Sequence, residues 1–379
     1  MTERTMFMKC LIMSVKAGFG HHSTGQAIVD YLNSNNVQCE MLDILEYINP
    51  LLSETINDGY LVLTKYLTDL YGKAYTKLDK HDEEYDKLSP ITIVSKLVSR
   101  KLRDYITEFN PDVVIGTHSY ACLLMTHLKT KEYIKCPTFG IVTDFTVHPF
   151  WESTNIDYYI TADKLLNNQM KKKGIPEQRI LPFGIPIKSK FSTAIPKNEA
   201  KKVLNISDKF TILIMMGSMG FGNITKFLKR IDDLPTDFQI LCVCGNNSKA
   251  KKEIDNTSWN KKIYTYGFID NVDVMMDASD CIITKPGGLT TSELLAKKLP
   301  AIIINPIPGQ EDRNLEFLVN SGAAIMATET FPVDEALYEI TNNPWRLDLL
   351  RQSVEHLGKP DSTKNLCEFI LKLEEKNLQ

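Results

Sequence analysis

The chain has 379 residues, enough for two domains that each bury a core, and its formal net charge is -3. Hydrophobic residues make up 43% and charged residues 24%, a globular composition that excludes collagen-like, disordered and coiled-coil chains. A slightly acidic chain lacks the clustered Lys and Arg that duplex binding requires, so we expect no nucleic-acid partner.

The first apolar run, residues 6–15, resembles the core of a signal peptide, but Lys9 interrupts it and Gly-rich sequence follows without a cleavage pattern. We interpret it as a first β-strand. No stretch approaches the roughly 20 apolar residues of a membrane-spanning helix. Any membrane contact should therefore be peripheral.

Apolar runs alternate with segments of helical periodicity through the first half of the chain. The strands expected here cover residues 6–15, 37–42, 112–115 and 138–142, and the helices cover 24–33 and 121–129. Strands that alternate with helices predict an α/β fold with a doubly wound parallel sheet.

Residues 44–90 do not follow this alternation and look like an insertion. No strand divides them, and they carry a long helical pattern that includes Leu63, Leu67, Leu70 and Ala74, with Tyr60, Tyr66, Tyr71 and Tyr75 nearby. One interpretation is a helix packed against the first sheet. The other is an amphipathic, Tyr-rich edge for an apolar acceptor or a bilayer surface.

The strand and helix pattern restarts at Phe210, after a Pro-rich segment that contains Pro182, Pro186 and Pro196. We place the boundary at residues 190–208. The predicted domains are residues 1–195, residues 205–358 and a C-terminal helix within 359–379. In the second domain, strands are expected at TILIMMG, at ILCVCG, at a run that ends in YGF, at CIIT and at PAIIINP, with helices at residues 225–231 and from Thr290.

The eight cysteines show neither a CxxC pair nor a histidine at metal-ligand spacing. We therefore expect no metal site, and the scattered thiols suggest a reducing, cytosolic setting. Cys242 and Cys244 form a CxC inside an apolar run, which predicts buried core positions in a strand.

Three predicted strand ends in the first half carry groups suited to acid–base chemistry. GFGHHSTG supplies Gly20, His21 and His22, GTHSYA supplies His118, and TDFTVHPFW supplies Asp144 and His148. Because ligands of α/β sheets bind beyond the carboxyl ends of the strands, these groups should converge on one cleft.

GFGHHSTG does not complete the GxGxxG pattern of dinucleotide-binding proteins. The second strand has only Asp43 near the place where a ribose-binding acid would stand. An NAD-dependent enzyme is therefore disfavoured.

The second half contains two Gly-rich segments that could hold a phosphate. GSMGFGN offers Gly217, Ser218, Gly220 and Gly222 after a strand. TKPGGLTTSE places Gly287 and Gly288 before a helix whose first-turn amides suit a diphosphate, with Glu293 for ribose hydroxyls. The structural alternative is a capping box from Thr290 to Glu293, with Glu311 and Asp312 as ordinary first-turn acids.

The block from YGFIDNV to PIPGQEDRN closely resembles the donor domain of bacterial diacylglycerol glycosyltransferases and plant monogalactosyldiacylglycerol synthases, in glycosyltransferase family 28. GFGHHSTG resembles the N-terminal loop of that family, with Phe19 where Gly is common, and TDFTVHPFW resembles its TD…HxxW segment. The resemblance implies a GT-B fold, with two Rossmann-like domains facing a cleft. It also implies a C-terminal helix, near residues 364–375, that returns to the N-terminal domain.

The resemblance also assigns site residues. The diphosphate would meet Ser218 with its neighbouring glycines, and Gly287, Gly288 and Leu289. The Phe268 backbone would meet uracil, Glu293 would bind the ribose, and Gln310 and Glu311 would bind the sugar hydroxyls. Thr290 also belongs to the expected donor site. On the acceptor side, the resemblance matches His21 to the histidine of the N-terminal loop, and the cleft predicted from the strand ends adds Gly20, His22, His118 and His148.

Such enzymes invert the anomeric centre, so a base must take the proton of the attacking hydroxyl. His21 is our first candidate and Asp144 the second. Amides and a helix dipole can stabilise the leaving diphosphate, so we expect neither a metal nor another cofactor. The implied partners are UDP-glucose or UDP-galactose, diacylglycerol and a membrane surface, with the protein cytoplasmic at the inner face of the cell membrane.

Three alternatives stay open at this point. They are a GT-B transferase for a polyprenyl-linked acceptor, a UDP-N-acetylglucosamine 2-epimerase, and a non-catalytic sugar-nucleotide-binding protein. The first calls for basic residues in the N-terminal cleft, which are not obvious in the sequence. Retention of His21 and Asp144 argues against the third.

Overall fold

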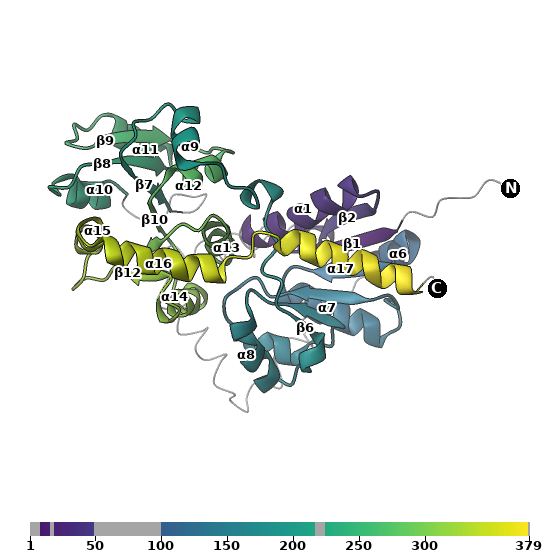
Figure 1. Cartoon of the computed structure of the whole chain (residues 1–379). Coiled ribbons are helices and arrows are strands. Elements are labelled where there is room, and N and C mark those ends of the chain that lie inside the picture. The colour runs from purple at the N-terminus through teal and green to yellow at the C-terminus, as the bar shows by residue number, and fades with distance from the viewer. Residues whose placement is uncertain (1–7, 16–18, 49–99, 217–223, 378–379) are drawn as a thin grey trace. The chain divides into compact units, whose positions relative to one another are not determined.

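The computed structural model describes residues 8–15, 19–48, 100–216 and 224–377 (Figure 1). The chain divides into two compact units. The first comprises residues 1–189 and 361–379, and the second comprises residues 190–360. The predicted insertion at 44–90 lies outside the described residues, except for its first five.

The first unit contains a parallel six-stranded sheet in the order β2-β1-β3-β4-β5-β6. Its strands are β1 (Lys9–Ser14), β2 (Gln38–Asp43), β3 (Val113–Gly116), β4 (Thr138–Ile141), β5 (Tyr158–Ile160) and β6 (Ile180–Leu181). The central strands are buried on both faces, as expected for a parallel sheet covered by helices.

The helices of the first unit connect these strands. They are α1 (Phe19–Ser34), α2 (Ile44–Ile48), α6 (Arg100–Phe109), α7 (Ser119–Thr130) and α8 (Asn167–Lys172), with short 3-10 turns η2 (Pro149–Ser153), η3 (Lys164–Leu166), η4 (Glu177–Arg179) and η5 (Ser189–Phe191), the last crossing into the second unit. Gly116 lets α7 approach β3 closely, because a Cβ there would lie 2.6 Å from the Cys122 sulfur.

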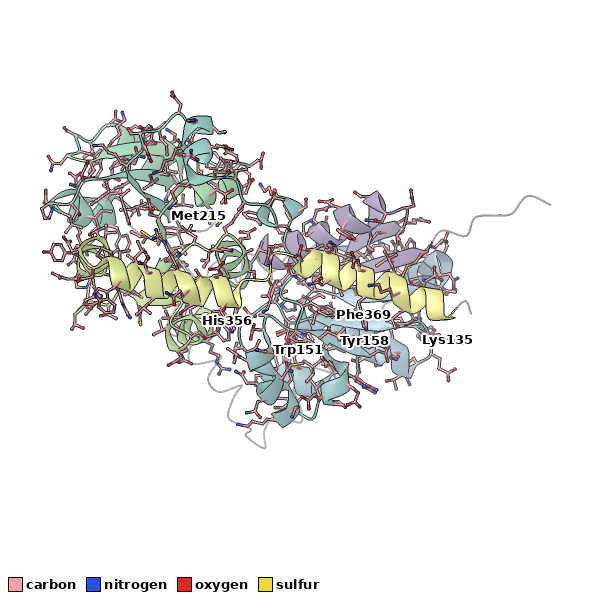
Figure 2. The ribbon with its side chains drawn as sticks, viewed as in Figure 1. Lys135, Trp151, Tyr158, Met215, His356 and Phe369 are labelled. Atoms are coloured by element: carbon pink, nitrogen blue, oxygen red, sulfur yellow. The ribbon has the colours of Figure 1, made fainter. Side chains whose placement is uncertain are left out.

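The last helix, α17 (Ser362–Asn377), belongs to the first unit although it follows the second unit in the chain. Its apolar face, formed by Leu366, Cys367 and Ile370, is buried in the core of the first sheet. The Phe369 ring meets Tyr158 edge-on at 5.3 Å between centroids (Figure 2). This packing fixes the C-terminal segment on the first unit.

The second unit repeats the architecture, with a parallel sheet in the order β12-β11-β10-β7-β8-β9. Its strands are β7 (Phe210–Met215), β8 (Phe238–Val243), β9 (Lys262–Tyr266), β10 (Cys281–Thr284), β11 (Ala301–Ile303) and β12 (Ala324–Met326). Its helices are α9 (Lys197–Val203), α10 (Ile224–Asp232), α11 (Ser248–Asp255), α12 (Val272–Ala278), α13 (Gly288–Ala296), α14 (Gln310–Asn320), α15 (Val333–Asn342) and α16 (Pro344–Leu357).

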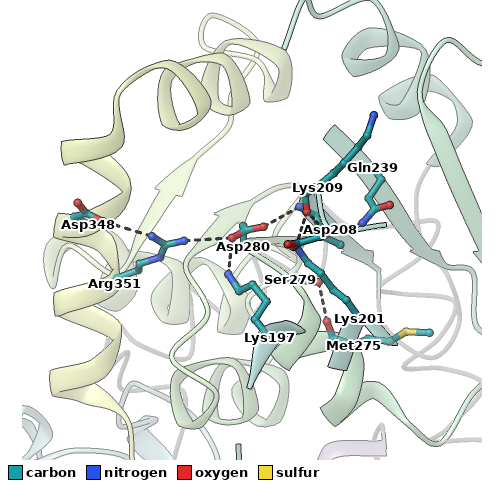
Figure 3. A network of polar contacts seen from close by, with 11 residues as sticks. Lys197, Lys201, Asp208, Lys209, Gln239, Met275, Ser279, Asp280, Asp348 and Arg351 are labelled. Carbon is teal, nitrogen blue, oxygen red and sulfur yellow. Dashed lines mark hydrogen bonds and ion pairs between the residues drawn. The ribbon is translucent and has the colours of Figure 1, made fainter. Parts of the chain in front are cut away.

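Asp280 organises a polar network at the start of β10 (Figure 3). Its carboxylate accepts from the Thr211 amide at 2.8 Å and pairs with Lys197 at 2.5 Å and Arg351 at 3.4 Å. These contacts join β7, β10, α9 and α16, so they hold together elements that are distant in sequence. We assign this network a structural role.

Each sheet has one point where the strand order reverses. In the first sheet the chain runs from β1 outward to β2 and then returns to β3 on the other side of β1. In the second sheet it runs from β7 to β9 and returns to β10, beside β7. Ligands of open α/β sheets bind at such switch points, beyond the carboxyl ends of the strands.

Several expectations from sequence require correction. The first helix begins at Phe19 and not at Thr24, so Gly20, His21 and His22 lie in its first turn and not in a preceding loop. Strands β5, β6 and β12 were not expected, because strands of two or three residues carry no measurable alternation. β11 is equally short, but it lies within the longer apolar run PAIIINP.

Cys242 and Cys244 are fully buried, which confirms their predicted core position. All eight cysteines carry free thiols.

Candidate active site

His21 lies at the switch point of the first sheet, in the first turn of α1. Its Nδ1 atom is 2.9 Å from the carbonyl oxygen of Thr117, the residue after β3, and 2.9 Å from Oγ1 of Thr143, which follows β4. A carbonyl oxygen only accepts hydrogen bonds, so Nδ1 carries the proton. The neutral ring therefore keeps its lone pair on Nε2, the arrangement of a general base.

The Thr117 carbonyl is itself held in place. The Thr117 amide donates to the Met13 carbonyl at 3.1 Å, and its buried hydroxyl donates to Ser14 Oγ at 3.0 Å. Both partners belong to β1, so the acceptor of the His21 proton is fixed by the central strands of the sheet. A rigid acceptor of this kind selects one imidazole tautomer.

His118 and His148 have the opposite tautomer. His118 caps α7 by accepting the Tyr120 amide on Nδ1 at 3.0 Å, and His148 caps η2 by accepting the Phe150 amide at 3.1 Å. An amide N–H only donates, so both rings carry their proton on Nε2 when neutral. The His118 ring meets His21 edge-on, with 4.5 Å between centroids.

All three imidazoles favour the neutral form. Burial lowers the pKa of His21, although the nearby charge of Asp144 and the hydrogen bond to Thr117 oppose this. Burial, followed by the charges of His21 and His148, lowers the pKa of His118 well below its usual value. Burial and Lys173 lower the pKa of His148 to about 4. The cluster thus presents one basic nitrogen and two N–H donors near neutral pH.

The remaining predicted residues of this edge are close by in the fold. Asp144 directly follows Thr143 and is half-buried, and its negative charge acts on His21. Gly20 and His22 flank His21 in α1 and are also half-buried. The turn that carries His148 is anchored by Trp151, which is buried, with its ring 3.1 Å from a Cβ built on Gly140.

In the second unit, Gly287 occupies the N-cap of α13, and Gly288, Leu289 and Thr290 form its first turn. The capping-box alternative is therefore wrong: Thr290 lies three residues inside the helix, and the N-cap has no side-chain hydrogen bond. The first-turn amides of α13 and the positive end of its dipole stand at the switch point between β7 and β10. Thr284 Oγ1 donates to the Met215 carbonyl at 2.6 Å and joins these two strand ends.

Glu311 and Asp312, at the start of α14, have different roles. Asp312 accepts the Gly309 amide at 3.0 Å and caps α14, as the structural alternative expected. Glu311 accepts the Ile307 amide at 2.6 Å, and its other oxygen lies 4.0 Å from a Cβ built on Gly287. The N-terminal turns of α13 and α14 are thus neighbours.

Two residues here were not singled out from the sequence. Burial lowers the pKa of the Lys285 ammonium, while the charge of Glu311 opposes the change, so these two side chains lie within electrostatic reach. Asn314 is fully buried, and its amide donates to the Pro286 carbonyl at 3.0 Å, which fixes the loop before Gly287. Lys285 stands inside TKPGG and Asn314 inside PIPGQEDRN, but neither residue type by itself marks a site.

The other predicted donor residues are distributed around this edge. Phe268 follows β9 and is 63% exposed, Glu293 lies in α13 and is half-buried, and Gln310 begins α14. Gly217, Ser218, Gly220 and Gly222 lie outside the described residues.

Within the described ranges, no three His, Cys, Asp or Glu side chains converge as metal ligands. In the same residues, no helix is both long enough and apolar enough to cross a bilayer.

Two family models match most of the chain. Residues 21–187 match the model of monogalactosyldiacylglycerol (MGDG) synthase, and residues 211–361 match the glycosyltransferase family 28 C-terminal domain. The processive diacylglycerol beta-glucosyltransferase of Bacillus pumilus is 28% identical over 96% of this chain and 94% of its own. The Bacillus subtilis protein of the same name is 27% identical over 96% of this chain and 95% of its own.

Solved structures share the fold at low identity. MurG of Acinetobacter baumannii has a TM-score of 0.62 at 14% identity, over 96% of this chain and 99% of its own. The UDP-GlcNAc 2-epimerase of Neisseria meningitidis has a TM-score of 0.58 at 15% identity, over 96% of this chain and 100% of its own. The two Rossmann-like units are thus those of the GT-B fold, as expected. The two family models show that this chain is a member of the glycosyltransferases that combine an MGDG-synthase domain with a family 28 C-terminal domain.

Proposed function

We propose that this protein is an inverting glycosyltransferase that moves a hexose from a UDP-sugar to the hydroxyl of diacylglycerol or of a glycosyl-diacylglycerol. The names of the relatives, which span nearly the whole chain, support this lipid acceptor and favour glucose as the sugar. The MGDG-synthase match keeps UDP-galactose as the second donor to test.

One observation carries the chemical part of the proposal. His21 stands at a switch point with its Nδ1 proton bound to the Thr117 carbonyl, which leaves Nε2 free to accept a proton from an acceptor hydroxyl. An imidazole whose pKa is lowered stays neutral at the pH of the cytosol, so the base is available without prior deprotonation.

In the proposed step, the acceptor oxygen attacks the anomeric carbon of the donor as His21 Nε2 takes the hydroxyl proton. The bond between that carbon and the diphosphate oxygen breaks, and UDP leaves with the electron pair. The new glycosidic bond has the opposite anomeric configuration. His21 then returns its proton to solvent, and Asp144 stabilises the transient imidazolium through its charge.

On the donor side, we propose that the diphosphate binds at the N-terminus of α13, where Gly287 and Gly288 let backbone amides approach it. Lys285 would supply a positive charge as the leaving group gains negative charge, with Glu311 holding the ammonium nearby. These groups can stabilise the leaving diphosphate without a metal ion or another cofactor.

The experiment that tests this function measures UDP release by the purified chain with a panel of UDP-sugars, with and without dispersed diacylglycerol, followed by chromatography of the lipids. We expect a new glycolipid with UDP-glucose that depends on diacylglycerol. UDP-sugar binding without any lipid product would refute the assignment.

The same assay separates the alternatives. A product only with a polyprenyl-linked acceptor would indicate that branch of the family, and conversion of UDP-N-acetylglucosamine without acceptor would indicate an epimerase. Binding without turnover of any donor would indicate a sugar-nucleotide-binding protein. The fold is shared by transferases and epimerases, so only turnover distinguishes them.

We further propose that the first unit binds peripherally to the inner face of the cell membrane, at a basic edge next to the acceptor site. Leu165 is 54% exposed beside the exposed Lys164, and the exposed Lys172 follows in α8. Lys173 pairs with Glu152 of η2 at 2.7 Å, which fixes α8 beside the turn that carries His148. A leucine among lysines suits an anionic lipid surface.

Sedimentation with vesicles tests this surface. Replacing Lys164 and Lys172 with Glu should reduce binding to anionic vesicles, whereas replacing the exposed Lys249 of the second unit should not. Equal binding of all variants would contradict the proposed edge.

A further inference from the structure

Two aromatic side chains continue the row of imidazoles away from His21. The Tyr120 ring, at the start of α7, stacks on His118 with 5.0 Å between centroids and an interplanar angle of 25°. The Phe150 ring, in η2, lies 5.5 Å from Tyr120 and also meets His148 at 4.3 Å. Tyr120 thus contacts His118, the imidazole that in turn contacts His21.

The Tyr120 ring does not serve the core, because Tyr120 is 42% exposed. Its neighbour Phe150 is half-buried. The backbone of both residues is held by hydrogen bonds. The Tyr120 amide donates to His118 Nδ1, and the Phe150 amide donates to His148 Nδ1. Two rings held next to one another at the rim of a site form a preorganised apolar surface.

This surface suits a sugar ring better than it suits glycerol. The C–H groups on one face of a hexose form a flat apolar patch that packs on aromatic rings, while its hydroxyls project from the edge. In their neutral forms, His118 and His148 carry the proton on Nε2, because their Nδ1 atoms accept backbone amides, and an Nε2–H group is a donor suited to a hydroxyl oxygen. Diacylglycerol has no rigid flat face of this kind.

We propose that Tyr120 and Phe150 form a stacking platform for the sugar of an acceptor lipid that already carries one hexose. This proposal rests on the proposed function and extends it. When the platform holds the first sugar, one of that sugar's hydroxyls can reach His21 Nε2, and the platform thereby favours addition of a second sugar.

The test compares two acceptors, diacylglycerol and the purified monohexosyl-diacylglycerol, with the same UDP-sugar. For Tyr120→Ala and Phe150→Ala, we expect the ratio of kcat/KM for the glycosylated acceptor to kcat/KM for diacylglycerol to fall roughly fivefold to tenfold. The products should shift from dihexosyl to monohexosyl lipid. Tyr120→Phe keeps the ring and should keep the wild-type ratio.

Tyr133 provides a matched control. It is 40% exposed and lies in the same unit, beyond the far end of α7, with Arg103 over its ring. Tyr133→Ala should leave the acceptor ratio unchanged.

The outcomes are distinct. An equal fall for both acceptors would overturn the platform, since the rings would then contact a part common to both lipids. An unchanged ratio in both alanine variants would also overturn it, as would a wild-type protein that glycosylates diacylglycerol but never the monohexosyl lipid. Failure of the wild-type protein to form any glycolipid would instead refute the proposed function.

Discussion

His21 Nδ1 and the carbonyl oxygen of Thr117 lie 2.9 Å apart, and this contact fixes which nitrogen of the imidazole can accept a proton. A backbone carbonyl here accepts the hydrogen bond from Nδ1, as a carboxylate does in a serine protease triad, but it adds no negative charge. Burial keeps the His21 pKa low, although the charge of Asp144 and the hydrogen bond to Thr117 both raise it.

The pH profile of the reaction should depend on Asp144. The base form of His21 is lost as the pH falls through its pKa, so kcat/KM should decline on the acid side, below the ordinary histidine value of 6.5. Asp144 raises that pKa, so Asp144→Asn should move the acid limb to lower pH.

Activity measured from pH 4.5 to 8 checks this expectation. If Asp144→Asn instead lowers kcat/KM about a hundredfold at every pH, Asp144 is the base and His21 is not.

Thr143 should act as a positioning residue, because its hydroxyl is the second group within 2.9 Å of His21 Nδ1. Thr143→Val keeps the shape and removes the hydroxyl. We expect kcat to fall roughly threefold to tenfold while KM for the lipid stays the same, and Thr143→Ser should restore kcat.

Thr107 offers the control, since its exposed hydroxyl only donates to the Arg103 carbonyl within α6. An equal effect of Thr143→Val and Thr107→Val would show that hydroxyl loss acts through stability alone.

Lys285 should contribute to binding of the diphosphate. Its ammonium lies within reach of Glu311, at the N-terminal end of α13. Lys285→Met should weaken UDP binding about tenfold or more in calorimetry, because a charge-assisted contact is lost. Lys298→Met is the comparison: that exposed lysine of the same unit pairs with Glu355. Equal dissociation constants for wild type and Lys285→Met would exclude this role.

The first unit should lose stability on acidification because His148 is neutral in the folded state. Its pKa is about 4, below the unfolded value of 6.5. Well above pH 6.5, His148 is neutral in both states. As the pH falls, His148 becomes protonated in the unfolded chain near pH 6.5, whereas in the folded chain it stays neutral until about pH 4. Between pH 7.5 and 5 this should cost about 1 to 2 kcal/mol of unfolding free energy.

His148→Asn keeps an acceptor for the Phe150 amide and removes the titrating group. Urea unfolding at the two pH values should therefore show a weaker pH dependence for this variant. Parallel curves for the variant and the wild type would mean that other groups cause the loss.

The positions of strands could be predicted from the sequence where burial is strong. β1, β3 and β7 are continuous apolar runs buried on both faces, and such runs are visible in sequence. β6 consists of Ile180 and Leu181 alone, and its strand character comes from pairing with β5. The start of α1 was also missed, because two glycines next to Phe19 are typical of a loop.

The site was predictable in its composition but not in its electronic detail. The three strand ends indicated that His21, His118 and His148 would gather at one edge. Which nitrogen of each ring carries the proton depends on whether a carbonyl or an amide faces it, and sequence does not encode that. Thr143 and Lys285 could not be singled out from the sequence either, because only the fold places them next to His21 and Glu311.

The most direct test of the account combines two readouts on His21→Ala. UDP binding should match that of the wild type, because His21 belongs to the first unit and the proposed donor residues belong to the second. Formation of the glycolipid should fall about a hundredfold or more, the usual contribution of a general base. Near-normal glycolipid formation by His21→Ala would contradict the assignment of His21 as the base and transfer that role to Asp144.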